Sequence, residues 1–536
     1  MPKITLNKKE TLKLVGKNIP DKQLEESIPL LGTDLERVTK DKIEVEIFPN
    51  RPDMLSEEGF ARALSSFMGI KTGLKSYKVN SSKYKYIIDS KVKSVRPYCG
   101  AAVVKGVKFT EASLTGFMNL QDKLHTTHGR NRAKVAMGAH DLTNVSFPIK
   151  YTTKPRSFKF RALGDSEENT ISYILQEHPK GSAYAHILDK KEVPIWIDSK
   201  NQVLSMPPII NSEQTKLTIK SKDILLDVTG SSQESVDQAL NILVTALADR
   251  SGKIYSVNNQ PKLKPHKLKV NINKVNKLLG LNLKKSEISK LLAKMGMKYS
   301  PSTSSVEYPA YRTDILSEVD IVEEIAIAYG YNNFSSSIPN ISTIAQEDPF
   351  EKFKNIIANI CTGLGLQEVS SYHLSNLEDE TTKMKLNLKP IKIKNSISSE
   401  YNVLRPTITP SLLNVLKINR HNEYPQNIFE MGNVFLKNGN NIEEPTRIGI
   451  ALCHSKADYT EAKKALDSIL SSLGLTGKYE STDHPPFIPG RVARVSIKNK
   501  KVAYVGELHP EVLNNFDIDT PTATIELNLT EIFSLI

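Results

Sequence analysis

A run of carboxylates lies within one helix-like segment, Asp314 to Tyr331, and this segment limits what the chain can fold into more than any other feature. Apolar residues recur in it at helical spacing, namely Ile315, Val319, Val322, Ala326 and Tyr329. We expect a helix with Asp314 as its N-cap and Gly330 as its C-terminal stop.

Three further carboxylates, Asp320, Glu323 and Glu324, are expected on one arc of this helix, because residues three and four apart are neighbours on a helical surface. Like charges this close repel one another unless a cation or a basic side chain lies among them. Oxygen ligands without His or Cys suit magnesium or calcium and argue against zinc. A solvated acidic face, favoured by the helix dipole, is the alternative.

Two short segments, 311–314 and 329–333, flank the acidic helix. Together with it they resemble one segment of the beta subunit of phenylalanyl-tRNA synthetase, of the archaeal and eukaryotic type. The resemblance implies a magnesium site at the junction with an alpha subunit. The ligands it implies here are Asp314, Asp320, Glu323 and Glu324.

The bulk properties of the chain limit its class. Its 536 residues are too many for one hydrophobic core, so several domains are expected. The N-terminal residues lack the apolar core of a signal peptide, and the longest apolar run, 239–248, is about half a membrane span. Three widely separated cysteines give neither a disulfide framework nor a metal-binding spacing. We expect a cytoplasmic protein with no membrane segment.

The formal net charge of +13 favours a polyanionic partner, because phosphate neutralisation with counterion release supplies most non-specific affinity for nucleic acids. A basic composition without such a partner is the alternative. The resemblance implies binding of tRNA-Phe.

The predicted fold class is multidomain α+β, with boundaries at the Pro- and Lys-rich linker 260–269 and at a second linker, 334–340. Four domains are expected: a small α/β domain over 1–85, a mixed α/β editing domain over 86–262, a small helix-containing metal-binding domain over 268–336, and a class II synthetase-like antiparallel-sheet domain over 340–536.

Two local patterns in the first domain are clear. Ile43, Val45 and Ile47 alternate with acidic residues, which predicts a half-buried strand, and a helix is expected from Ser56 to the stop at Gly69. We interpret the turn 50–53, with its two prolines, as structural rather than as a tRNA contact.

Segments 203–212 and 225–230 resemble the editing domain of the family. Ser205 and Asn211 flank a Pro-Pro bend, and Asp227 and Thr229 share one face of a strand. The resemblance implies hydrolysis of tyrosyl-tRNA, which is needed because a phenylalanine pocket rejects an added hydroxyl only about a hundredfold. From the residues alone, we would instead expect Asp227 and Thr229 to build a turn and Asn211 and Ser212 to cap a helix.

A His-containing basic stretch, 124–134, belongs to the same region. His125 and His128 suggest a metal site, but no matching second pair of ligands accompanies them. We expect a solvated basic loop near tRNA phosphates.

The last domain resembles the catalytic-like module of the family in the segments that contain Arg405, Glu430, Arg491, Glu507 and His509. The arginine patterns with which class II synthetases hold the adenylate are not intact. The resemblance therefore implies that ATP and phenylalanine bind mainly to a separate alpha subunit, and that these five residues serve the fold and an interface.

The function implied is that of the non-aminoacylating subunit of phenylalanine–tRNA ligase. An α2β2 heterotetramer would attach phenylalanine to its tRNA with ATP, with editing on this chain. The alternative is a free-standing tRNA-binding or deacylase paralogue that acts without an alpha subunit.

Overall fold

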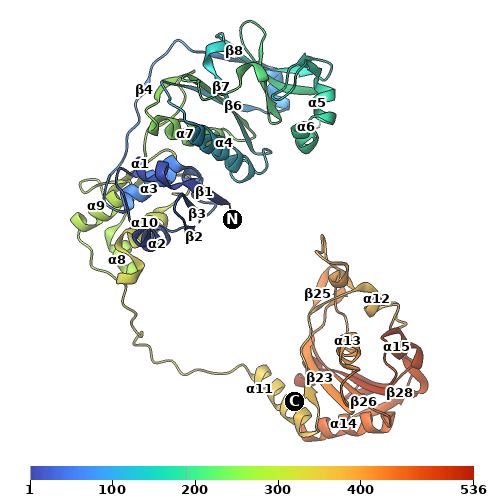
Figure 1. Ribbon diagram of the computed structural model, residues 1–536. Helices are drawn as coiled ribbons and strands as arrows, with labels where there is room; N and C mark the ends of the chain where they lie inside the picture. The colour runs from blue at the N-terminus through green and yellow to red at the C-terminus, as the bar shows by residue number, and fades with distance from the viewer. Residues whose placement is uncertain (1, 189) are drawn as a thin grey trace. The chain divides into compact units, whose positions relative to one another are not determined.

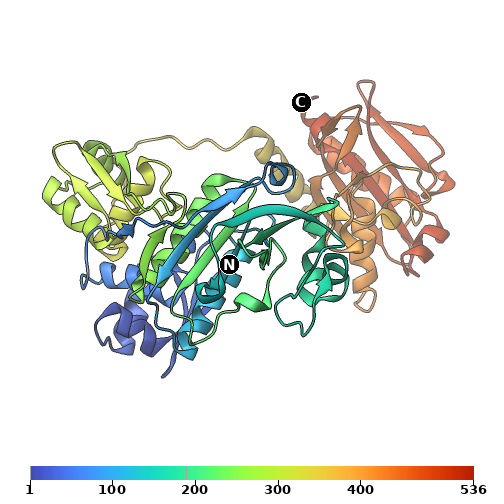
Figure 2. The ribbon, with the colours of Figure 1, turned by 90° about the horizontal axis from the view of Figure 1, so that it is seen from above.

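Residues 2–188 and 190–536 are described by a computed structural model (Figure 1). They fold as two units, and the boundary between them along the chain lies between Ile338 and Pro339. Figure 2 shows both units from above. Residues 334–348 form no helix or strand. The predicted α+β class, with several sheets, is confirmed. Within the described ranges, no helix is both long enough and apolar enough to cross a membrane.

The first unit begins with a layer of strands in the order β1-β3-β2 and the helices beside them. The predicted alternation is present in β3, where Ile43 and Val45 are fully buried and the intervening Glu44 is not. The elements of this layer are β1 (Lys3–Asn7), α1 (Lys8–Val15), α2 (Asp21–Leu30), β2 (Asp34–Val38), β3 (Lys42–Glu46) and α3 (Glu57–Phe67).

Helix α3 begins where predicted, because Ser56 Oγ accepts the backbone N–H of Gly59. A Cβ on Gly59 would lie 1.7 Å from the carbonyl oxygen of Asp53, so only glycine fits there. The preceding turn holds the buried Arg51 and Asp53, whose side chains form two hydrogen bonds of 2.9 Å. This buried ion pair stabilises the turn.

Two five-stranded sheets follow, in the orders β4-β15-β6-β14-β7 and β13-β12-β11-β8-β5. Helices α4 (Glu111–Thr126) and α7 (Gln233–Asp249) pack against the first sheet. The strands of the first sheet are β4 (Val79–Asn80), β6 (Tyr98–Lys105), β7 (Val135–Asp141), β14 (Ile224–Gly230) and β15 (Lys253–Ser256). Those of the second are β5 (Tyr86–Ile88), β8 (Ile149–Pro155), β11 (Glu192–Ile197), β12 (Val203–Met206) and β13 (Ile210–Asn211).

Residues 217–223 precede β14 and are not part of it. Ser221 Oγ accepts the N–H of Thr218 and closes a turn there. The full length of β14 is buried.

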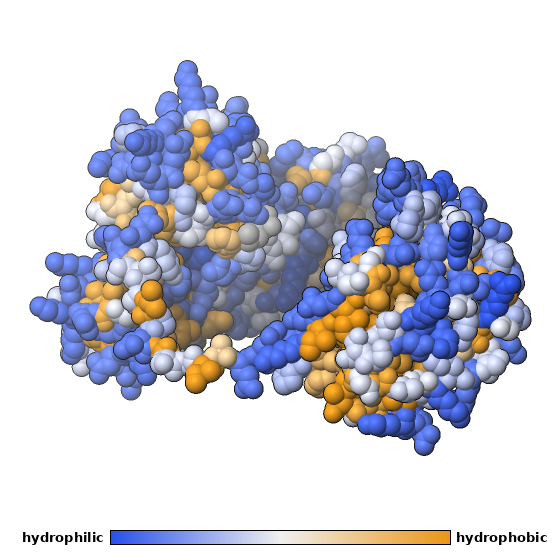
Figure 3. Space-filling view, turned by 90° about the horizontal axis from the view of Figure 1, so that it is seen from below, coloured by the Kyte–Doolittle hydropathy of each residue, from blue (hydrophilic) through white to orange (hydrophobic). Residues whose placement is uncertain are grey.

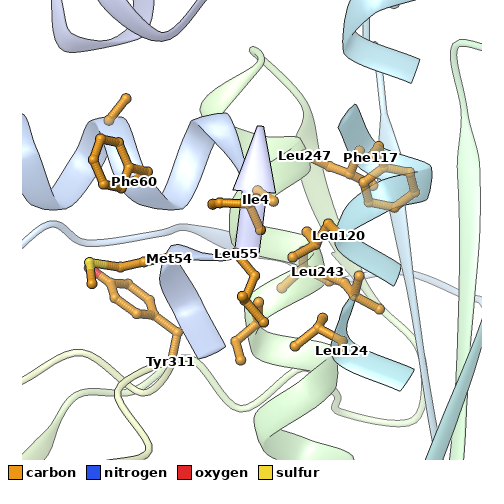
Figure 4. Packing of buried hydrophobic residues seen from close by; sticks show 14 of the residues in the cluster. Ile4, Met54, Leu55, Phe60, Phe117, Leu120, Leu124, Leu243, Leu247 and Tyr311 are labelled. Atoms are coloured by element: carbon orange, nitrogen blue, oxygen red, sulfur yellow. The ribbon is translucent and has the colours of Figure 1, made fainter. Parts of the chain in front are cut away.

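One hydrophobic core joins the N-terminal layer to the elements that follow. Figure 4 shows side chains of the N-terminal layer packed against those of α4, α7 and Tyr311. Phe60, Leu120 and Leu243, which come from α3, α4 and α7, are each fully buried in it. Removing any one of these layers would therefore expose apolar surface of the others.

The last layer of the first unit carries the acidic segment. Its strands have the order β16-β18-β17. Its elements are β16 (His266–Lys269), α8 (Ile272–Leu279), α9 (Lys285–Lys294), β17 (Lys298–Ser300), β18 (Ser305–Tyr308) and α10 (Glu318–Tyr329).

The acidic helix α10 begins later than predicted, and the assignment of Asp314 as its N-cap is wrong. The N-cap is Ser317, and Asp320 Oδ2 accepts the N–H groups of Leu316 and Ser317 at 2.8 and 2.6 Å. The predicted buried stripe is also partly wrong, because Val319 is 50% exposed. Ile321 is fully buried in place of it.

The second unit is built on a seven-stranded sheet in the order β19-β23-β26-β30-β29-β28-β27. All its pairs are antiparallel except β19 with β23. The strands are β19 (Gln367–Glu368), β23 (Gln426–Asn433), β26 (Thr446–Cys453), β27 (Lys478–Ser481), β28 (Phe487–Ile497), β29 (Lys500–Leu508) and β30 (Thr522–Asn528).

Helices cover both faces of this sheet, so its inner strand β26 is buried almost throughout. Ile448 and Ile450 enter a core with α11 and α14, whereas Ala451 and Cys453 enter a core with α13 and α15. The helices are α11 (Pro349–Gly363), α13 (Thr409–Asn419), α14 (Tyr459–Ser472), α15 (Pro510–Asn515) and α16 (Leu529–Phe533).

Candidate functional site

A cavity of about 520 Å³ lies between the two five-stranded sheets of the first unit, beside α4. Its walls come from α4, from the start of β7, from the bend between β12 and β13, and from β14. Three of the four predicted editing residues line it: Ser205, Asn211 and Asp227.

Asp227 is the centre of a buried hydrogen-bond network in this cavity. Its Oδ2 accepts from His140 Nε2 at 2.7 Å and from Ser205 Oγ at 3.1 Å. Nδ1 of the same imidazole lies 2.8 Å from Thr215 Oγ1, which fixes the ring from its other side. Asp227 is 2% exposed and His140 is not exposed at all. The carboxylate is thus held in one orientation from two sides, by His140 of the neighbouring strand β7 and by Ser205 of β12 in the other five-stranded sheet.

Gly138 of β7 pairs with Asp227 and leaves room for this network. A Cβ on Gly138 would lie 2.5 Å from Asp227 Oδ2, 2.9 Å from Asn211 Oδ1 and 2.9 Å from His140 Nε2. These three distances are too short for a carbon atom, so the network requires glycine at this position.

Thr229, the fourth predicted residue, is buried near the cavity but is not one of its lining residues. Its Oγ1 accepts from Arg96 Nε at 2.9 Å, and Arg96 Nη2 also donates to the carbonyl oxygen of Arg132 at 3.0 Å. Thr229 therefore supports the loop that carries Arg132.

The expectation of a solvated basic loop at 124–134 is wrong for His125 and Arg132. His125 is 6% exposed and Arg132 is 9% exposed, and both line the cavity. The sequence did hold a signal for His125, because it continues the buried positions Phe117 and Leu124 of α4 at helical spacing.

His125 is held as a neutral imidazole. Burial, with a further contribution from Arg132, lowers the pKa of His125 to about 3. Its Nε2 accepts the N–H of Met137 at 2.9 Å, so the ring hydrogen is on Nδ1. Nδ1 has no hydrogen-bond partner among the described residues.

His128 is only partly buried, and its Nε2 lies 3.2 Å from the carbonyl oxygen of Ser235. Burial lowers the pKa of His128. The two histidines do not share a ligand position, and no group of three or more His, Cys, Asp or Glu in residues 2–188 and 190–536 could hold a metal ion.

The four predicted magnesium ligands fall into two sets. Asp314 and Glu324 are both bound by the buried guanidinium of Arg312, through contacts of 2.6 to 3.0 Å. Although burial opposes the charged form, Glu324 and Asp314 hold the pKa of Arg312 well above its usual range. In this arrangement a basic side chain, not a metal ion, lies between these two carboxylates.

The other two carboxylates of the acidic helix have different partners. Asp320 caps α10, and Glu323 is exposed and accepts from Tyr331 Oη at 2.8 and 2.9 Å. The donor set has the hard oxygens that magnesium prefers. In this arrangement, however, the four side chains do not fit one magnesium ion, because Asp314 and Glu324 are already bound to the guanidinium of Arg312.

The predicted structural residues of the second unit are in structural positions. Arg405 is 1% exposed, and its Nη1 donates to Glu430 Oε1 at 2.7 Å. Arg491 pairs with Glu507 at 2.6 Å near the surface. His509 is the N-cap of α15. All five residues therefore make contacts within the second unit.

Three family models match the chain in consecutive regions. They are the B3/4 domain over 96–251, the tRNA synthetase B5 domain over 268–331, and the phenylalanyl tRNA synthetase beta chain CLM domain over 335–529. Together with the sheet of the second unit, they place the chain among the aminoacyl-tRNA synthetases.

Full-length relatives give the particular family. The chain is 38% identical to the phenylalanine–tRNA ligase beta subunit of Archaeoglobus fulgidus, over 99% of each chain. It is 38% identical to that of Pyrococcus abyssi, over 99% of this chain and 100% of the relative. A crystal structure of an N-terminal fragment of the phenylalanyl-tRNA synthetase beta subunit from Pyrococcus horikoshii matches with a TM-score of 0.59 and 38% identity. The match covers 61% of this chain and 99% of the fragment. The chain belongs to the phenylalanine–tRNA ligase beta subunit family.

Proposed function

We propose that this beta subunit hydrolyses tyrosyl-tRNA in the cavity around Asp227. The observation that carries the proposal is the fixed carboxylate of Asp227 in a cavity of about 520 Å³, with Ser205 and Asn211 in the same wall. Such a site can select tyrosine by a hydrogen bond to its phenol, which phenylalanine lacks. It can also position a water molecule for attack on the ester.

Point substitutions in the assembled enzyme test this proposal. Asp227→Ala or Ser205→Ala should slow release of tyrosine from pre-charged tRNA while sparing attachment of phenylalanine. A discriminating hydrogen bond left unmade costs about 1 to 3 kcal/mol, which is roughly a tenfold to hundredfold drop in rate. Equal loss of both activities would indicate misfolding, and loss of neither would remove these residues from the site.

We propose further that the chain acts in an α2β2 heterotetramer with an alpha subunit that binds ATP and phenylalanine. Two observations on the second unit support this. Arg405, Arg447 and Arg491 form ion pairs within this unit. It also exposes apolar side chains, among them Ile356 of α11 (51% exposed) and Ile536 (67%), and Figure 3 shows apolar residues gathered on one face of this unit.

If ATP and phenylalanine bind to the alpha subunit, the isolated chain should show no phenylalanine-dependent ATP–pyrophosphate exchange. Robust exchange by the isolated chain would refute this assignment of substrate binding to the alpha subunit.

The three cysteines, which are all free and buried, support the proposal of a reducing, cytoplasmic setting.

Magnesium at Asp314, Asp320, Glu323 and Glu324 remains a prediction. It would require Arg312 to release Asp314 and Glu324 in the assembled enzyme. Asp320→Ala and Glu323→Ala should then lower magnesium affinity, measured by equilibrium dialysis of the metal alone against the complex. Unchanged metal content in both variants would show that these carboxylates form ion pairs and hydrogen bonds only and do not bind magnesium.

A further inference from the structure

Two hydrogen-bond donors in the wall of the editing cavity have no partner. They are Nδ1 of His125 and Nε of Arg132, both buried and both without an acceptor in the described part of the chain. A buried donor without a partner costs about 1 to 3 kcal/mol. Two such donors in one cavity wall point to an acceptor that arrives with the ligand.

The two residues that carry these donors are neighbours in space. The backbone N–H of Arg132 donates to the carbonyl oxygen of His125 at 3.0 Å, and the charge of Arg132 is one reason for the low pKa of His125. Lys180 lines the same cavity and also contributes to that low pKa. This corner is therefore positively charged, whereas another part of the wall carries the carboxylate of Asp227.

Both donors are also fixed in place. His125 is held through the N–H of Met137 on its Nε2. Arg132 Nη1 donates to the carbonyl oxygens of Pro208 and Ile209 at 3.2 and 2.6 Å, and its guanidinium lies 4.5 Å from the centre of the Tyr184 ring. Donors fixed before the substrate arrives need no reorganisation during the reaction.

The backbone that presents Arg132 is strained. Arg130, Asn131 and Arg132 have φ values of 48°, 51° and 69°, so three consecutive non-glycine residues lie in the left-handed region. Such strain persists only when the surrounding structure enforces it, and it is concentrated at functional sites. Gly129 allows the close turn before them, because a Cβ there would lie 2.7 Å from the carbonyl oxygen of His125.

We propose that His125 Nδ1–H and Arg132 Nε–H form the oxyanion-binding pair of the editing site. The inference rests on the proposed hydrolysis of tyrosyl-tRNA. Water attacks the carbonyl carbon of the ester, and the carbonyl electron pair moves onto its oxygen, where the two N–H groups bind the negative charge. The intermediate then expels the ribose oxygen, which takes one of the two protons of the water, and tyrosine leaves as its carboxylate while the other proton passes to the solvent.

A tRNA phosphate is the other negatively charged oxygen that could occupy this corner. Two donors suit one oxygen better than a phosphate group, and the carboxylate of Asp227 in the same cavity disfavours a second full negative charge. The two occupants differ in kinetics. Loss of an oxyanion donor lowers the maximal rate, whereas loss of a phosphate contact weakens binding.

The test is single-turnover deacylation of tyrosyl-tRNA by the assembled enzyme, with enzyme concentration varied to separate the maximal rate from the half-saturating concentration. His125→Ala and Arg132→Lys should each lower the maximal rate about 100- to 1000-fold, with half-saturation within about twofold of the wild type. His125→Asn, which keeps an N–H donor, should recover part of the rate. His128→Ala is the matched control, because His128 does not line the cavity, and it should deacylate normally.

A maximal rate within threefold of the wild type in Arg132→Lys and His125→Ala would overturn the proposal, as would a rise in half-saturation without a change in rate. If only His125→Ala lowers the melting temperature, the proposal is judged from the maximal rates of Arg132→Lys and His125→Asn. A wild-type enzyme without deacylase activity would refute the proposed function as well. Deacylation that is sensitive to Asp227→Ala but not to these variants would refute the donor pair alone.

Discussion

Replacing Gly138 by alanine adds one methyl group at the centre of the editing cavity. The new Cβ would lie 2.5 Å from Asp227 Oδ2, whereas real Cβ atoms essentially never come closer than 3.0 Å. The carboxylate of Asp227 must therefore move by at least about 0.5 Å, the difference between these two distances, unless the strand moves instead.

This displacement acts on the two hydrogen bonds that orient Asp227, from His140 at 2.7 Å and from Ser205 at 3.1 Å. Overpacking of this kind costs about 1 to 3 kcal/mol of stability. A misplacement of about 1 Å at a reacting group can cost roughly a hundredfold in rate. We expect Gly138→Ala to slow hydrolysis of tyrosyl-tRNA about 10- to 100-fold.

The assay is release of tyrosine from pre-charged tRNA by the assembled enzyme, run beside phenylalanine attachment on the same preparation. Gly106→Asn is the control, because a Cβ there meets nothing within 4 Å and asparagine tolerates the left-handed backbone of that position. It should leave both activities unchanged. Normal deacylation by Gly138→Ala would show that the orientation of Asp227 does not limit editing, and would refute this reasoning.

Two further predictions concern stability. Glu324→Ala should lower the free energy of unfolding by about 3 kcal/mol, because it leaves the buried Arg312 with Asp314 as its only carboxylate partner. Substitution of the exposed Glu323 by alanine should change this free energy by less than about 0.5 kcal/mol. Equal effects of the two substitutions in urea unfolding would contradict the importance of the buried ion pair. Burial raises the pKa of Glu380 from 4.5 to about 8, so the stability that its protonated form contributes is complete below about pH 4.5 and is lost as the pH rises to about 8. Unfolding of the full chain between pH 5 and 8 should show this decline, and Glu380→Gln should reduce it.

Local pattern predicted the elements whose structure depends on local contacts. The alternation around Ile43 gives β3, and the Ser56 cap gives α3, because a strand face and a helix cap each involve residues close in sequence. Asp227, Ser205 and Asn211 were found through the family resemblance, and they do line one cavity.

What the sequence did not predict depends on contacts between distant residues. Arg312 binds Glu324 across twelve positions, and the same guanidinium binds Asp314, which is therefore an ion-pair partner and not the helix cap. Gly138 must be glycine because of a carboxylate on the neighbouring strand. His125 was interpreted as a loop residue because its charged neighbours dominate the local composition, although its spacing from Phe117 and Leu124 places it on the buried face of α4.

The shared core of the first unit also decides which perturbations can test its functions. Helix α7 packs on the sheet that carries Asp227, and Asn241 of this helix donates to the carbonyl oxygen of Ala310 at 3.2 Å, next to the acidic segment. At its far end Asp249 pairs with Arg62 of α3, whose guanidinium lies 4.0 Å from the centre of the Tyr311 ring. Deleting residues 86–262 would therefore expose the core of the N-terminal layer and remove the support of the acidic helix. Loss of editing in such a deletion would report unfolding, so single substitutions in the cavity wall are the perturbations that can separate editing from assembly.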